Sequence, residues 1–138
     1  MKIIEEIVKN TELGIDAIDN VAPYVQSQDL ANKLAQHKIS YQKIKTEAEQ
    51  QLTDHKVKES KPNKFQKSML KMSAKFNAMF DPSDSHISEM MIEGTNMGIN
   101  SVQSVINEMQ SEGDEVPQLA VDYVNMMQSN INELRSFL

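Results

Sequence analysis

Apolar residues recur every three or four positions along most of the chain. The first such stripe predicts a helix over residues 3–22, ended by Pro23, which cannot continue a helix interior without losing a hydrogen bond. The second begins after Ser27, the expected N-cap, and alternates steps of four and three. Together they predict a hairpin that turns about residues 25 and 26. The stripes are Ile4, Ile7, Val8, Thr11, Ile15, Ile18 and Ala22, then Leu30, Leu34, His37, Tyr41, Ile44, Ala48 and Leu52.

Two more helices are predicted in the second half. Asp81-Pro82-Ser83-Asp84 is a helix-start pattern, in which Asp81 caps, Pro82 takes the first helical position and Asp84 completes the capping box. This helix should run to about residue 111, where Gly113 ends it and Asp114 caps the next. Its main stripe is Ile87, Met91, Gly94, Gly98, Ser101, Val105 and Met109, with a second apolar line at Ile92, Ile99 and Ile106; the last stripe is Ala120, Val124, Met127, Ile131, Leu134 and Leu138.

The middle of the chain has a different pattern. Residues 55–63 lack periodicity and contain Pro62, which predicts a linker. Residues 64–80 follow as a short amphipathic helix with an apolar side of Phe and Met. Beside that side runs a lysine stripe, formed by Lys64, Lys67, Lys71 and Lys75.

These elements predict an all-α fold: a four-helix bundle with an extra short amphipathic helix between its second and third helices. At 138 residues, one domain spanning 1–138 is expected. The absence of Cys excludes disulfides, thiolate chemistry and zinc–cysteine sites. No apolar run could span a bilayer and no signal peptide is recognisable, so a cytoplasmic protein is expected.

A cysteine-free bundle raises the class of di-iron and di-manganese proteins, which hold their metals with inward-facing Glu and Glu-x-x-His. No Glu or Asp here has His three residues later, and the nearest pattern is the reversed His86-x-x-Glu89. The stripes themselves are predicted to be free of central carboxylates. We therefore expect no metal, no cofactor and no catalytic residue.

The region from Lys64 to Met109 resembles a small bacterial ferritin-like family of four-helix proteins of unknown function. The resemblance rests on the basic amphipathic segment, the Asp81-Pro82 break and Ile92-Glu93-Gly94-Thr95-Asn96 within a long helix. Glu93 matches the first acid of the family's Glu-x-Gly-Glu-like signature, whereas Thr95 and Asn96 replace its Gly and second Glu. The resemblance implies a ferritin-like fold and supplies no activity.

His37 and Tyr41 stand at the centre of the second stripe. The predicted hairpin places His37 opposite Gly14, where a missing side chain leaves room. One interpretation is a small polar pocket with His37 as ligand or proton carrier and Tyr41 beside it. The other, which we favour, is a core histidine and tyrosine hydrogen-bonded to their neighbours.

Two other features concern association. Gly94 and Gly98 are spaced for close helix packing. The lysine stripe suits an acidic partner or an anionic membrane surface, although a helix docked on the bundle with solvated lysines explains it as well. The net charge of −6 disfavours nucleic acid as the partner. The favoured function is non-catalytic association, chiefly with a second copy; the alternatives are a metal-dependent or redox bundle and a membrane-binding module.

Overall fold

The computed structural model describes residues 1–53 and 81–138. Within these ranges the chain forms α-helices and short 3₁₀ helices and no strand, which confirms the all-α prediction. The elements are α1 (Lys2–Val21), η1 (Ala22–Tyr24), α2 (Gln28–Thr53), α4 (Asp84–Ser111), α5 (Gln118–Leu134) and η2 (Arg135–Phe137). The predicted linker at 55–63 and the predicted short helix at 64–80, with its lysine stripe, lie outside the described residues.

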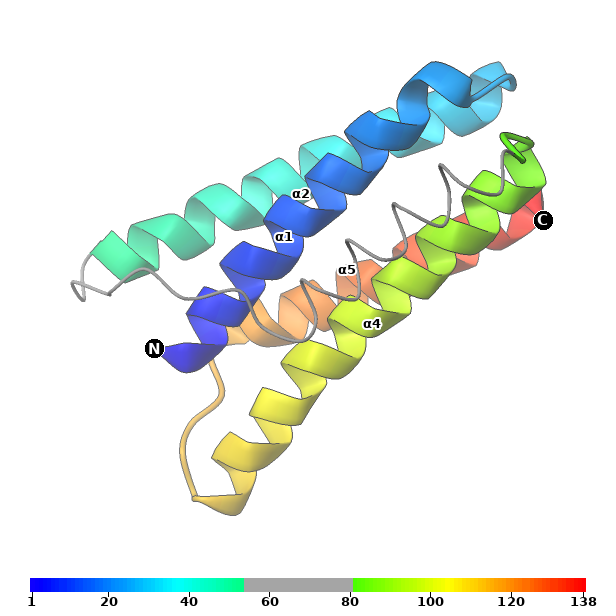
Figure 1. The fold of residues 1–138 in the computed structure, drawn as a ribbon. Helices are drawn as coiled ribbons and strands as arrows, with labels where there is room; N and C mark the ends of the chain where they lie inside the picture. The colour runs from blue at the N-terminus through cyan, green and yellow to red at the C-terminus, as the bar shows by residue number, and fades with distance from the viewer. Residues whose placement is uncertain (54–80) are drawn as a thin grey trace.

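The four long helices form two antiparallel hairpins, α1 with α2 and α4 with α5 (Figure 1). The hairpins join where α1 packs on α4 and α2 packs on α5, which leaves α2 and α4 on a diagonal. Helix α4 begins at the end of the bundle where α2 begins, so these two helices run in the same direction (Figure 1). The last residue of α2 and the first residue of α4 therefore lie at opposite ends of the bundle.

The buried faces of these helices enclose one apolar core, to which all four contribute. The predicted stripes of α1, α2 and α5 are largely the buried faces, whereas the stripe of α4 is wrong at two positions. Gly94 and Ser101 are half-buried, and their neighbours Thr95 and Val102 are buried instead. The buried face of α4 is thus wider than the single predicted stripe, because the helix packs between α1 and α5.

Helix starts follow local hydrogen bonding. Ser27 caps α2 as predicted, since its hydroxyl accepts from the Leu30 amide at 3.2 Å. The prediction that Asp81 caps α4 is wrong. Ser83 is the N-cap, and its hydroxyl accepts from the His86 amide, while Asp81 accepts from the amide of Ser83. A cap must accept from an amide inside the first turn, and Asp81 lies too far before Asp84, where the helix begins.

Asp84 does not complete a capping box. Its two carboxylate oxygens accept from the backbone amides of Gln26 and Ser27, at 2.9 and 2.8 Å. These amides belong to the loop between α1 and α2, so one side chain ties the turn of the first hairpin to the start of the second.

We expect Asp84→Ala to lower the free energy of unfolding by roughly 1–2 kcal/mol, because two hydrogen bonds to a carboxylate are lost and neither amide has a replacement side chain. Urea denaturation followed by circular dichroism measures this change. Asp81→Ala is the matched control. It removes an exposed contact within the same turn and should change the stability much less; equal losses from the two variants would contradict the bridging role.

Past Ser111, α4 ends in a turn around Gly113, whose φ of 77° lies in the left-handed region that glycine adopts without strain. The amides of Gly113 and Asp114 donate to carbonyls of the last helical turn, at 3.1 and 2.8 Å. The backbone of Asp114 thus closes α4. The prediction that Asp114 caps α5 is wrong. Pro117 is the N-cap of α5. That helix stops at Leu134, and Leu138, predicted to be in its stripe, is 62% exposed.

Candidate functional site

His37 and Tyr41 both point into the bundle from α2, as predicted, but the residue opposite Gly14 is Tyr41 and not His37. A Cβ built on Gly14 would lie 2.5 Å from Cζ of Tyr41, so the tyrosine ring lies directly on the glycine. The ion pairs Asp19–Lys38 and Glu12–Lys45 show the same register. Because η1 and the loop after it form the turn, the midpoint of the hairpin lies beyond residue 26. Helix α2 is therefore displaced along α1 by about one helical turn from its predicted position.

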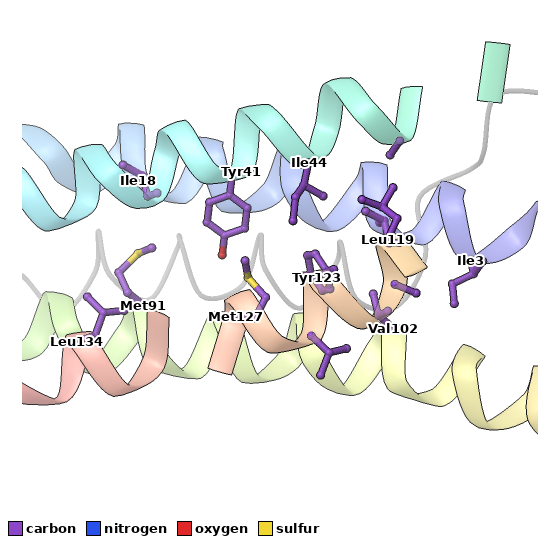
Figure 2. Packing of buried hydrophobic residues seen from close by; sticks show 14 of the residues in the cluster. Ile3, Ile18, Tyr41, Ile44, Met91, Val102, Leu119, Tyr123, Met127 and Leu134 are labelled. Carbon is purple, nitrogen blue, oxygen red and sulfur yellow. The ribbon is translucent and has the colours of Figure 1, made fainter. Parts of the chain in front are cut away.

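Tyr41 crosses the centre of the bundle (Figure 2). Its hydroxyl is hydrogen-bonded with Thr95 on the diagonal helix α4, and the Thr95 hydroxyl donates to the carbonyl of Met91 at 2.6 Å. Burial raises the pKa of Tyr41 to about 12, while the bond with Thr95 opposes that rise. Tyr41 is therefore a neutral core residue whose hydroxyl has a partner.

Tyr123 of α5 lies in the same part of the core (Figure 2). It is 1% exposed, and burial raises its pKa well above the ordinary value, with smaller contributions in the same direction from Tyr41 and Glu6. Together with Met127, these two tyrosines fill the middle of the bundle (Figure 2).

His37 lies at the contact between α2 and α5, where it meets a carboxylate. Its Nε2 is 3.5 Å from Oε1 of Glu133, the outer limit of a hydrogen bond, and no well-formed hydrogen bond is made there. The second oxygen of Glu133 binds Nζ of Lys33 at 2.6 Å. The His37 side chain is 5% exposed, whereas that of Glu133 is 37% exposed. These three residues form what we call the Lys33–His37–Glu133 cluster.

Two members of the cluster, His37 and Glu133, have lowered pKa values. Burial lowers the pKa of His37, because a buried imidazolium loses its water; Glu133 opposes this effect and Lys33 adds to it. The pKa of Glu133 is lowered chiefly by the hydrogen bond from Lys33. At neutral pH the cluster thus consists of a neutral imidazole beside a lysine–carboxylate pair.

Glu6 forms a second polar contact, which the sequence reasoning missed. Its carboxylate accepts from the hydroxyl of Ser101 on α4 at 2.9 Å and lies 3.3 Å from Nζ of Lys9. The Glu6 side chain is 12% exposed, so a carboxylate lies at the edge of the core, outside the predicted stripe. A signal was present, since Glu6 is three residues after Ile3 and four before Asn10, both of which are buried.

Further buried polar groups lie outside these contacts. Asn10 donates through Nδ2 to the carbonyl of Glu6, but its Oδ1 has no hydrogen-bond partner among the described residues. Within the same part of the chain, Ser88 Oγ and Asn130 Nδ2 are also buried without a partner. Buried groups of this kind cost free energy, so the interior is less uniformly apolar than the stripes predicted.

Gly98 is buried and Gly94 half-buried, and their predicted role in close packing stays a prediction. Among residues 1–53 and 81–138, no group of three or more His, Cys, Asp or Glu side chains is placed to hold a metal ion. The metal-dependent or redox alternative likewise stays a prediction. The lysine stripe is not described, so its proposed partners are untested.

None of the helices described here is both long and apolar enough to cross a membrane. No protein-family model, curated protein or solved structure matches the chain.

Proposed function

We propose that this chain is a ferritin-like, non-catalytic bundle that acts by association, and that its partner is a second copy of itself. The observation that supports this most directly is the filled centre of the bundle. Tyr41, Tyr123 and Met127 occupy the middle of the core, where a ferritin-like enzyme keeps its inward-facing carboxylates (Figure 2). The outer surface is therefore the better candidate for function.

The direction of the helices supports the ferritin-like part of the proposal. Helices α2 and α4, the second helix of the first hairpin and the first helix of the second hairpin, run in the same direction (Figure 1). This direction is typical of ferritin-like bundles and differs from that of bundles that run up and down with short loops throughout.

The second apolar line of α4 is the surface we assign to the contact between copies. Ile106 is buried, whereas Ile92 and Ile99 are half-buried, two turns apart on the same helix. A row of partly exposed isoleucines gains free energy when a partner covers it. The same line on a second copy would make a self-complementary contact, as two-fold dimers require.

Sedimentation equilibrium tests the proposal. We expect the unchanged protein to form dimers, and Ile92→Gln with Ile99→Gln to raise the dissociation constant at least about tenfold, which corresponds to a loss of about 1.4 kcal/mol. Ile39→Gln is the matched control: it makes the same chemical change at a position of α2 that is 65% exposed, and it should leave the dissociation constant unchanged.

A protein that stays monomeric at high concentration would overturn the proposal. Dimers that weaken with Ile39→Gln and not with the α4 variants would keep association but move the interface to α2. Circular dichroism of each variant shows whether a lost dimer reflects a lost fold.

A further inference from the structure

We propose that the Lys33–His37–Glu133 cluster is an acid-sensitive contact between the two hairpins, which weakens when His37 takes up a proton. This inference is independent of the proposed association. The cluster lies where α2 meets α5, and this is one of the two seams along which the α1–α2 hairpin packs on the α4–α5 hairpin.

Glu133 favours an imidazolium at His37, but not enough to offset the burial of the ring. Nε2 of His37 is buried and without a well-formed hydrogen bond, and the carboxylate that faces it is already bound by Lys33 at 2.6 Å. A proton on His37 would thus place a second cation beside one carboxylate, on an imidazole whose side chain is only 5% exposed.

Within residues 1–53 and 81–138, the other charged groups around α2 do not compensate. On α1, Asp19 is paired with Lys38 at 2.6 Å. On α4, the residue that reaches α2 near this level is Thr95, which is uncharged and bonded with Tyr41. Asp84, also on α4, binds the backbone at Gln26 and Ser27. That contact is ten residues before His37, roughly 15 Å along the helix.

The direction of the pH effect depends on whether His37 binds a proton more readily in the open or in the closed α2–α5 contact. In an opened α2–α5 contact His37 is hydrated and titrates near its ordinary pKa of about 6.5, whereas in the closed contact burial lowers that pKa. As the pH falls below about 6.5, the open form binds more protons than the closed form. The contact is therefore strongest above this pH, and it weakens until the pH reaches the lowered pKa.

Two measurements on the full chain test the proposal. An NMR titration of the His37 imidazole should give a midpoint below 6.5. Lys33→Met should raise this midpoint, because the positive charge of Lys33 lowers the His37 pKa. Glu133→Gln should lower it, because the negative charge of Glu133 raises the His37 pKa. Amide hydrogen exchange, expressed as protection factors, should show that residues 33–37 and 130–134 lose protection severalfold between pH 7.5 and pH 5.5.

His37→Gln should abolish this loss of protection. His86→Gln, which removes a histidine of α4 and leaves the cluster intact, should retain it. A His37 midpoint at or above 6.5, or the same loss of protection in His37→Gln, would overturn the proposal. If His37→Gln does not fold, the opposite shifts expected from Lys33→Met and Glu133→Gln still decide the matter.

Discussion

Replacing Tyr41 by Ala is expected to lower the free energy of unfolding by about 3–5 kcal/mol, the range measured for removal of a large buried ring. The ring is 4% exposed and lies between Gly14 and the core side chains of α4 and α5 (Figure 2). Glycine has no side chain that could move into the space, so the cavity would stay largely open. Urea denaturation followed by circular dichroism measures the loss.

Tyr41→Phe is the control for this prediction. It keeps the ring and removes only the hydroxyl that bonds with Thr95, so a loss of about 1 kcal/mol is expected. The Thr95 hydroxyl keeps its own bond to the carbonyl of Met91. If the two variants lose equal stability, the polar contact across the diagonal matters more than the packing of the ring, contrary to our account.

Replacing Gly14 by Ala is expected to destabilise the protein by about 1–2 kcal/mol, although alanine is the better helix former. The new Cβ would stand 2.5–2.9 Å from three ring atoms of Tyr41, and overpacking of this kind costs about 1–3 kcal/mol. Alanine returns up to about 1 kcal/mol of helix propensity. The steric cost should win, because the buried ring is enclosed by the core and has little room to move away.

The same change should have the opposite sign once the ring is gone. In a Tyr41→Ala background, Gly14→Ala meets no ring and should stabilise the protein by up to about 1 kcal/mol through helix propensity. A double-mutant cycle measures this coupling from four denaturation curves. Destabilisation by Gly14→Ala in both backgrounds would show that the helix contact at Gly14 does not depend on Tyr41. If Tyr41→Ala is too unstable to measure, Tyr41→Leu serves in its place.

The sequence determined the helices and most of their buried faces. A stripe of apolar residues at spacings of three and four is a local property, so it indicates where a helix runs and which side it buries. It was also sufficient to place His37 and Tyr41 inside the bundle and to identify Ser27 as a cap. It missed Glu6, which reads as a surface residue until Ser101 is brought beside it from a position 95 residues away.

Only the tertiary structure decided how far one helix slides along another. The pattern of a helix repeats every turn, so it is equally satisfied when α2 shifts by one turn against α1; the turn through η1 and the fit of Tyr41 on Gly14 select the register. The partners of His37 depend on that same choice, since Glu133 reaches it from a helix nearly a hundred residues further along the chain. The periodicity of the sequence therefore specified which face of each helix is buried. The position of each helix along its neighbour, and the polar contacts between helices distant in the sequence, were decided by packing.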